Sequence, residues 1–388
     1  MFRFSPYDPA VDADPFPAYQ ILRDDHPAFF SEEANMWVLS RYDDVLAALN
    51  DWRTYSSAKG NLMDEFPGRA GNSLGSSDPP RHDRLRALIQ HVFTKRNLEK
   101  LEGPVRALAN TVLDDIGDAR QFNFVEDFSA AITVKALLGL LGLPEGADGD
   151  MLREKAVLMV QTDPVTRQKT DVHIGAFQFV ADYAKRVLQE REANPGDDLI
   201  SQLLTAEIDG DKLSFLEVQI TITTLIMAGI ESLSGFFNMF GYNLATQHAA
   251  RRAVAQDNTL VADALEESLR FNTSAQRFRR VLTRDVELHG KTMREGQFVA
   301  LLYGSGNRDE RRFATPDVYD ITRKPKGHLG FGGGVHLCLG NSTARLVTRA
   351  SFEELMKRIP EFTLAGDTIK WLPSSTFRSP LVLNVTRP

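Results

Sequence analysis

The chain of 388 residues contains a single cysteine, Cys338, and this limits the chemistry that it can support. One thiol cannot form an internal disulfide, and it cannot supply a four-cysteine iron–sulfur cluster or a multi-cysteine zinc site. It can supply one thiolate to one metal ion. The cysteine lies in the stretch Phe331-Gly-Gly-Gly-Val-His-Leu-Cys-Leu-Gly340. The simplest alternative is a small buried residue behind a flexible glycine loop.

The surroundings of Cys338 favour a metal ligand over a packing residue. The preceding glycines allow the backbone to pass close to a flat, bulky group. The helix predicted over 338–359 would place unpaired N–H groups near the sulfur and favour the thiolate. Such a thiolate suits a haem iron, into which it donates electron density.

This stretch resembles the haem-ligand signature of the cytochrome P-450 family. The family pattern has Phe, Gly, Arg or His, the ligand Cys and a last Gly at fixed spacing. These positions hold Phe331, Gly334, His336, Cys338 and Gly340. The resemblance implies haem b (iron protoporphyrin IX) as the cofactor and Cys338 as the iron ligand. It covers essentially the whole chain, so residues 1–388 are expected to form one haem domain.

The pattern of apolar residues agrees with the fold that the resemblance implies, which is mainly α with a small β portion near the N-terminus. Helical periodicity predicts helices over 16–25, 43–49, 80–93, 98–116, 128–141, 150–160, 173–192, 215–246, 259–271 and 338–359. Alternation predicts short strands over 28–30, 36–39, 280–282, 298–302 and 381–385.

A second signature is Glu267-Ser-Leu-Arg270 within a predicted helix. Residues three apart share one helix face and can pair, although such pairs are most often solvent-exposed. In the family this pair joins a later arginine, here Arg323, and the resemblance implies that the three brace the haem-ligand loop.

A third signature begins at Asp78-Pro-Pro-Arg-His-Asp-Arg-Leu-Arg86. Prolines open a helix well, and His82 and Arg86 lie four apart on one face of it. The resemblance implies that His82, Arg86, Arg280 and His336 hold the two haem propionates. An exposed polar helix face is the alternative.

The fourth signature, Ala228-Gly-Ile-Glu-Ser232, lies in the longest predicted helix. By resemblance Ala228 and Gly229 open a groove for dioxygen, and Glu231 and Ser232 deliver protons there. The family usually carries Thr where this chain has Ser232. Serine keeps the hydroxyl but lacks the methyl group that restricts χ1. The alternative is a glycine used for packing beside a solvent-facing glutamate.

Substrate pockets of the family lie between three segments, which here contain Leu62, Met63, Thr224, Leu225, Ala228, Ala275 and Phe278. These residues predict a small, mostly apolar substrate. Lys59 and Arg277 would bind a substrate carboxylate if they faced inward, although solvent or a haem propionate is the simpler partner. Similarity to bacterial members that oxidise small para-substituted aromatic acids suggests an aromatic acid, and terpenoids remain the alternative.

Composition and charge limit the partners. A formal charge of −7 argues against nucleic acid. The N-terminus lacks the apolar core of a signal peptide, and the apolar stretch 220–230 is too short and too polar for a membrane span. We therefore expect a cytoplasmic protein without a membrane anchor.

Electrons would come from a separate [2Fe–2S] ferredoxin and its NAD(P)H-dependent reductase. A basic patch would attract that ferredoxin, formed by Arg81, Arg84, Lys95, Arg345 and Arg349.

The resemblance thus predicts a monooxygenase that hydroxylates or O-demethylates its substrate. Two other functions remain open. A peroxygenase would use hydrogen peroxide, although such members tend to lack the acid–alcohol pair. A non-enzymatic haem sensor would usually carry an output domain, and no sequence pattern indicates one.

Overall fold

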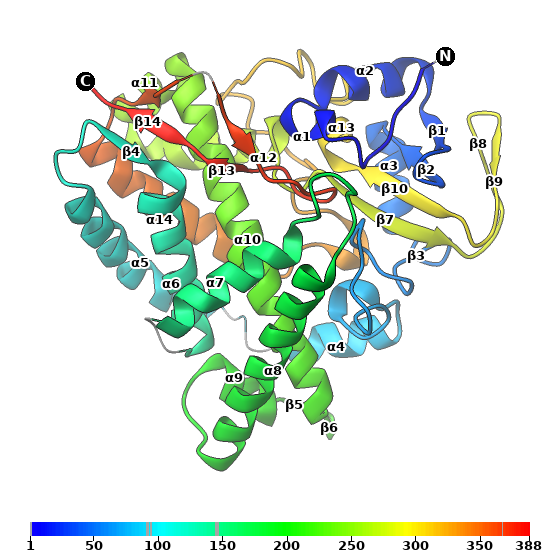
Figure 1. Cartoon of the computed structure of the whole chain (residues 1–388), viewed down its shortest axis with the longest axis horizontal. Coiled ribbons are helices and arrows are strands. Elements are labelled where there is room, and N and C mark those ends of the chain that lie inside the picture. The colour runs from blue at the N-terminus through cyan, green and yellow to red at the C-terminus, as the bar shows by residue number, and fades with distance from the viewer. Residues whose placement is uncertain (1, 91–92, 94, 144–146, 367) are drawn as a thin grey trace.

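The computed structural model describes residues 2–90, 93, 95–143, 147–366 and 368–388. Helices dominate it, and most of them gather at the left and bottom of Figure 1. The α-helices are α1 Ala10–Ala13, α2 Phe16–Asp25, α3 Tyr42–Asn50, α4 Arg81–Gln90, α5 Lys95–Ile116, α6 Ala131–Leu141, α7 Ala147–Val160, α8 Asp171–Ala193, α9 Leu199–Thr205, α10 Phe215–Thr246, α11 His248–Gln256, α12 Val261–Phe271, α13 Tyr303–Gly306 and α14 Asn341–Arg358. Single turns of other helix types are η1 Leu74–Ser76, η2 Phe124–Ala130, η3 Asn258–Leu260 and η4 Gly334–His336.

The strands are short. They are β1 Ala28–Ser31, β2 Met36–Leu39, β3 Tyr55–Ser56, β4 Gln121–Asn123, β5 Glu207–Ile208, β6 Asp211–Lys212, β7 Arg277–Leu282, β8 Val286–Leu288, β9 Lys291–Met293, β10 Phe298–Leu302, β11 Thr363–Leu364, β12 Lys370–Trp371, β13 Pro380–Val382 and β14 Asn384–Thr386. The main sheet, at the right of Figure 1, has the order β1-β2-β10-β7-β3. Only β2 and β10 pair in parallel. This sheet places one face of β7 toward the interior of the helical part.

Helix α10 crosses the middle of the molecule (Figure 1) and packs against α6, α7, α8 and α12. Ser214 caps its start, because the serine hydroxyl accepts from the Glu217 N–H and the Glu217 carboxylate accepts from the Ser214 N–H. The helix is long and apolar enough to cross a membrane, but 61% of its most apolar window is buried inside the protein. It is therefore a core helix, against which the neighbouring helices pack.

The predicted elements agree with the structure over most of the chain. All of the long predicted helices are present, although the one expected from 128 begins with the π turn η2 and continues as α6. The main sheet is not confined to the N-terminal sequence, because β7 and β10 complete it. The sequence missed α1, α9, α11 and α13, which are too short for their periodicity to stand out.

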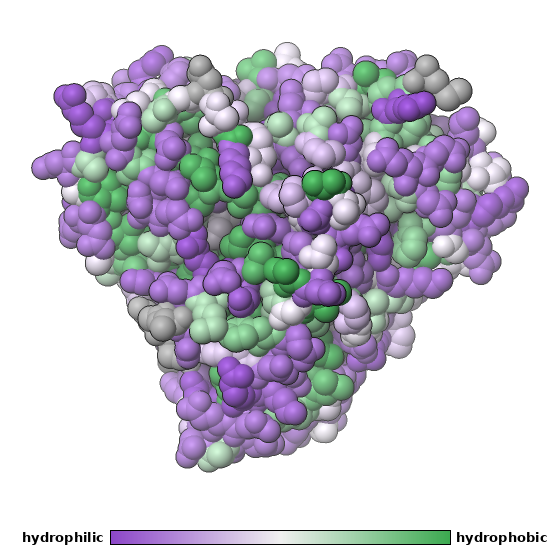
Figure 2. Space-filling model, in the orientation of Figure 1, coloured by the Kyte–Doolittle hydropathy of each residue, from purple (hydrophilic) through white to green (hydrophobic). Residues whose placement is uncertain are grey.

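One face of the molecule is mainly hydrophilic (Figure 2). Hydrophobic side chains gather near its centre, over α7, α8 and the loop between them. Val165 and Val172 in this region are 86% and 62% exposed.

Candidate functional site

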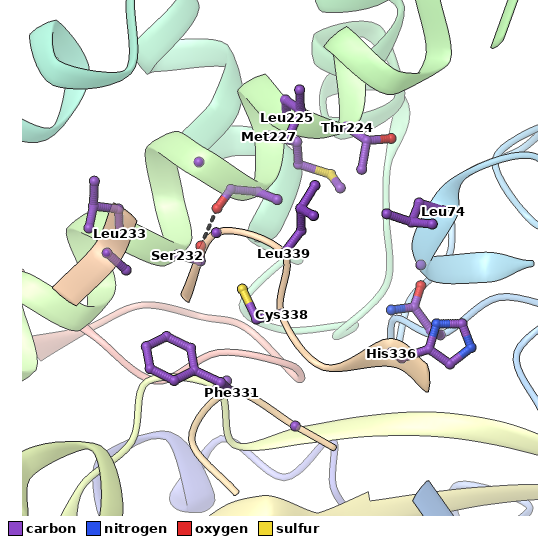
Figure 3. Close-up of a pocket in the computed structure, with 18 of the residues that line it drawn as sticks. Leu74, Thr224, Leu225, Met227, Ser232, Leu233, Phe331, His336, Cys338 and Leu339 are labelled. Atoms are coloured by element: carbon purple, nitrogen blue, oxygen red, sulfur yellow. Dashed lines mark hydrogen bonds between the residues drawn. The ribbon is translucent and has the colours of Figure 1, made fainter. Parts of the chain in front are cut away.

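A cavity of about 350 Å³ lies beneath α10 and includes the thiol of Cys338. Its walls come from the 61–75 segment, α4, α6, the end of α7, α10, the start of β7, the 330–340 loop, the start of α14 and the 376–377 turn. Figure 3 shows Cys338 between Phe331 below it and Ser232 of α10 above it. The thiol therefore faces a space bounded on its far side by the long helix.

The backbone of the 330–340 loop sets the position of the sulfur. The Cys338 N–H donates to the Phe331 carbonyl over 3.0 Å, and the Asn341 side chain donates to the Cys338 carbonyl over 2.6 Å. Gly334 adopts a φ of +61°, and a Cβ there would lie 2.1 Å from the Leu49 carbonyl oxygen. Only glycine fits this position, so the loop rests directly on the end of α3.

The electrostatics of the thiol differ from the sequence prediction. Burial raises the pKa of Cys338, whereas the Gly340 N–H and the cations Arg86 and Arg345 lower it. The helix was expected to begin at Cys338, but α14 begins at Asn341, so the sulfur lies before its first turn. In the protein alone, burial raises the pKa of the Cys338 thiol by more than the hydrogen bond from the Gly340 N–H lowers it. Charge on the sulfur then needs a nearby metal cation.

The four residues predicted to hold the propionates all line the cavity. The rings of His82 and His336 meet edge to face with centroids 4.6 Å apart. The Nε2 atom of each ring is buried and has no hydrogen-bond partner among the described residues. Burial, together with the charges of Arg280, His82 and Arg86, lowers the pKa of His336 to about 2.

These residues fit a haem. Two buried nitrogens without partners and two guanidinium groups, those of Arg86 and Arg280, form a donor set that suits two carboxylates. The same cavity offers one thiol, which suits one iron. Cys338 would hold the metal, and His82, Arg86, Arg280 and His336 would hold the propionates.

The predicted charge cluster assembles as expected. Glu267 and Arg270 are fully buried and pair over 2.6 Å. Arg323 joins through its Nε, 3.3 Å from the same Glu267 oxygen. Arg270 also donates to the carbonyls of Asn307 and Pro316. Asn307 in turn accepts from the Leu329 N–H over 2.6 Å, which connects the cluster to the start of the ligand loop.

A second brace was not predicted. Glu266 accepts from Arg345 over 2.5 Å and lies 3.0 Å from the His328 Nε2. Burial opposes ionisation of Glu266, but the hydrogen bonds from His328 and Arg345 lower its pKa to about 2. The Arg345 guanidinium also lies 4.6 Å from the centre of the Phe331 ring. The sequence offered little sign of this second brace, because Glu266, His328 and Arg345 are 17 to 79 residues apart in the chain.

The α10 segment divides between two faces. Ala228, Gly229 and Ser232 line the cavity, whereas Glu231 does not. Burial raises the pKa of Glu231 to about 8, and the charge of Arg153 on α7 opposes this effect. The Ser232 hydroxyl donates to the Ala228 carbonyl (dashed line in Figure 3). The predicted acid and alcohol are thus neighbours in sequence, but only the alcohol reaches the cavity.

Gly229 has a packing role that the sequence offered only as an alternative. A Cβ at this position would lie 2.7 Å from Cδ1 of Leu137 on α6. The glycine therefore allows α10 and α6 to approach closely beside the cavity.

The predicted substrate residues mostly line the cavity. Leu62, Thr224, Leu225, Ala228, Ala275 and Phe278 do so. Met63 does not, and its prediction was wrong. Its side chain is fully buried in the cluster that packs the sheet against α2, because the irregular 61–64 segment turns this side chain away from the cavity.

The structure does not bring Lys59 or Arg277 into the cavity, so the condition for either to bind a substrate carboxylate is not met. Lys59 is exposed and does not line the cavity. Arg277 is fully buried on the side of β7 opposite Phe278, near Tyr19 and Asp12. Its three guanidinium nitrogens have no hydrogen-bond partner among the described residues.

Other charged residues, which the sequence analysis missed, line the cavity instead. They are Asp64, Arg69 and Lys169. The sequence pattern could not place these side chains in the cavity, because they belong to two irregular segments, 61–73 and the loop between α7 and α8.

The predicted basic patch is largely neutralised. Arg84 pairs with Asp211 and Glu217, and these carboxylates lie on β6 and at the start of α10 rather than beside the ligand loop. Arg345 pairs with Glu266, and Arg349 pairs with Glu102 and Glu353. The side chain of Lys95 falls outside the described residues. These arginines therefore do not form an unpaired cationic surface.

Comparison with known proteins gives consistent matches over the whole chain. The family model described as Cytochrome P450 matches residues 151–365. Nocardicin C N-oxygenase of Nocardia uniformis subsp. tsuyamanensis is 33% identical over 400 residues, which cover 99% of this chain and 98% of the relative. 6-Deoxyerythronolide B hydroxylase of Saccharopolyspora erythraea is 30% identical over 385 residues, 94% of each chain.

Solved structures agree with this fold. Cytochrome P450 CYP109Q5 from Chondromyces apiculatus superposes with a TM-score of 0.90 at 29% identity, covering 99% of this chain and 98% of that one. P450BioI, solved with an acyl carrier protein bearing hexadec-9Z-enoic acid, gives a TM-score of 0.89 at 29% identity, with 98% and 99% covered.

Proposed function

This chain belongs to the cytochrome P450 family of haem b monooxygenases with a cysteine thiolate ligand, and we propose that Cys338 provides that ligand here. The reaction would insert one oxygen atom from O₂ into a small apolar or aromatic substrate, by hydroxylation or O-demethylation. One observation carries the proposal. A single cavity contains the only thiol, two imidazoles whose buried nitrogens lack partners, and a helix hydroxyl.

The haem, when bound, supplies an iron that activates dioxygen, with electron density donated by the thiolate. The chain's own residues would position it and exclude water. Arg86 and the two histidines would hold its carboxylates at one edge, and the Phe331 ring would cover the side of the thiol (Figure 3). Leu62, Leu225 and Phe278 would keep the substrate side apolar, as ligand pockets usually are.

Ser232 would handle protons in this arrangement. Its O–H already donates to the Ala228 carbonyl, so its oxygen is left to accept a hydrogen bond from a water in the cavity. A water held in this way could pass a proton onward within the cavity. Glu231 points elsewhere, so its part in proton delivery would require a side-chain rotation or a chain of waters.

We propose that electrons come from a separate [2Fe–2S] ferredoxin and its NAD(P)H-dependent reductase, and that the protein works in the cytoplasm as one haem domain. The single cysteine supports an external donor, because the chain cannot hold a four-cysteine cluster of its own. The docking surface would have to differ from the predicted arginine patch, whose members are paired.

The test is turnover of the haem-loaded protein under two regimes. Compounds that shift the haem spectrum, from a panel of small aromatic acids and terpenoids, would be incubated either with ferredoxin, reductase and NADH or with hydrogen peroxide alone. Oxygen-dependent product with NADH is the expected result. Product with peroxide only would favour a peroxygenase, for which the motivating observation is that Glu231 does not line the cavity. No product in either regime would favour a sensor.

A further inference from the structure

The cavity has a second charged end that the haem does not explain. Asn61, Asp64, Arg69, Lys169 and Thr376 line it, and we call these five residues the roof. They come from the 61–73 segment, the loop between α7 and α8 and the C-terminal turn. The donors assigned to the haem come from α4, β7 and the ligand loop. The two cations of the roof therefore remain without a role in holding the cofactor.

Lys169 is fixed in place with donor capacity to spare. Its ammonium group donates to the carbonyls of Met159 and Gln161 over 2.7 and 2.6 Å. It also lies 5.0 Å from the centre of the Phe66 ring. An ammonium has three N–H donors, so one remains for a ligand. In the described part of the chain, no carboxylate lies within ion-pair distance of it.

Arg69 also has an unused donor. Its Nη1 atom is 2.7 Å from both carboxylate oxygens of Glu65, and Asn61 accepts from both terminal nitrogens. Its Nε is buried and has no partner among the described residues, and the side chain is only 4% exposed. A buried N–H without a partner costs free energy unless a ligand or water satisfies it.

The lining of the cavity that contains both the roof and the thiol is mainly apolar. Its apolar residues include Leu62, Leu74, Met159, Val160 and Phe377. A ligand that fills this space needs an apolar body, and only its end can meet the two spare donors. We propose that the enzyme takes apolar molecules that end in a carboxylate, and that Lys169 and the Arg69 Nε hold that carboxylate at the roof. This inference rests on the proposed function only for the identity of the cavity as the substrate site.

Asp64 adds one acidic group to the roof but does not remove its preference for an anion. Burial raises the pKa of this carboxyl, whereas Lys169 and a hydrogen bond from Ser375 lower it, so burial disfavours its negative charge. Glu65 does not line the cavity, and it balances the charge of Arg69 from behind. The lining residues of the roof thus carry two cations against one acid.

The experiment measures binding rather than turnover. Isothermal titration calorimetry on the haem-loaded protein would compare octanoate, decanoate, dodecanoate and 4-phenylbutanoate, each with the alcohol of the same length. The expected result is that the acids bind about tenfold more tightly than the alcohols, since a charge-assisted hydrogen bond in a buried site contributes about that much. Lys169→Gln keeps a donor for the two loop carbonyls but removes the charge, and should abolish most of the preference. Lys185→Gln, at an exposed position of α8, is the matched control and should leave it unchanged.

A pH series on the unmodified protein gives a second measurement if the variant does not fold. Burial lowers the pKa of Lys169 to about 8, so the preference for acids should fall between pH 7 and pH 9. The charged groups that face Lys169 are Asp64 and Glu65 from one segment and His173 from α8. Ionisation of Asp64 would act in the same direction, and the pKa of His173 is lowered, so it stays neutral over this range.

Equal affinity for acids and alcohols, binding of neither, or an unchanged preference in Lys169→Gln would overturn the inference. None of these results would affect the proposed monooxygenase activity, because NADH-dependent turnover of neutral substrates tests that separately.

Discussion

The two ends of the cavity are both built on buried charges, but they are assembled differently. At the thiol end, Glu267 and Arg270 lie three residues apart on one helix and are completely buried. Outside the cavity, in the same loop that carries the roof residue Lys169, Arg167 pairs with Asp12 of α1, 155 residues away, over 2.7 and 2.9 Å. The thiol end starts from a pair that is local in sequence, and Arg323 joins that pair to brace one backbone loop. The roof joins segments that meet only in the folded protein, so its residues can change without moving the thiol.

The largest expected effect is at the thiol end. Glu267→Ala would leave Arg270 buried without its partner, at a cost of about 3–5 kcal/mol. We expect little haem-loaded protein, measured as haem absorbance per protein absorbance after purification. Arg167→Met, a variant in the loop that carries Lys169, is the control and should load haem normally. A stable, fully loaded Glu267→Ala protein would show that the cluster does not support the loop.

A smaller effect is expected at Glu231, which belongs to neither end. Its folded pKa is raised to about 8 from 4.5. Between these values the unfolded chain loses the proton and the folded protein keeps it, so stability falls as pH rises and the full penalty is present above about pH 8. One pKa unit corresponds to about 1.4 kcal/mol. Glu231→Gln should therefore be more stable than the parent by a few kcal/mol at pH 8.5, with little difference at pH 4.5.

Chemical denaturation of both proteins at the two pH values measures this difference. If Glu231→Gln gains nothing at high pH, the carboxylate has a partner that stabilises its charge. Both proteins should load haem equally, because Glu231 does not line the cavity.

In the loop that carries Lys169, Arg167→Met removes the ion pair with Asp12. The expected loss of stability is about 1–3 kcal/mol, as for a hydrogen bond to a charged group. We also expect faster entry of dodecanoate into the haem-loaded protein, measured by stopped-flow absorbance, since the α7–α8 loop loses its tie to α1. The control is Arg294→Met, which removes an exposed pair with Asp285. Unchanged entry rates would show that other contacts hold the roof.

The same contrast explains what the sequence could predict. Gly334, His336, Cys338 and the Glu267–Arg270 pair stand at short, fixed spacings, so a contiguous pattern was enough to identify the thiol end. The long helices were also predictable, because their apolar periodicity extends over many turns. The folded structure then brought Arg323 to Glu267 as expected.

The roof could not be predicted because it depends on which way side chains of irregular segments point. Met63 was placed in the pocket and Asp64 was not, although they are neighbours, and the structure reverses them. Lys59 and Arg277 were chosen as candidate cations by proximity in sequence, whereas tertiary position brings Arg69 and Lys169 into the cavity wall. Glu231 shows the same limit on α10, where adjacent residues face different sides.

The smallest expected effect concerns Ser232, which affects neither stability nor binding. Ser232→Ala should slow NADH use only modestly while diverting consumed oxygen from product to hydrogen peroxide. Ser232→Thr should match or improve the parent, because the added methyl restricts χ1. Product formed per NADH consumed, in all three proteins with one substrate, is the measurement. Equal coupling in Ser232→Ala would mean that the hydroxyl does not deliver the proton.

The central claim is that the thiol of Cys338 is the haem ligand of this cavity. The most direct measurement is the absorbance spectrum of the reduced protein with carbon monoxide, recorded for the parent and for Cys338→Ala at equal haem content. The account predicts that the parent absorbs near the wavelength for which the family is named, and that Cys338→Ala loses this band. A Cys338→Ala protein that keeps the band would contradict the account, because this chain has no other cysteine to provide a thiolate.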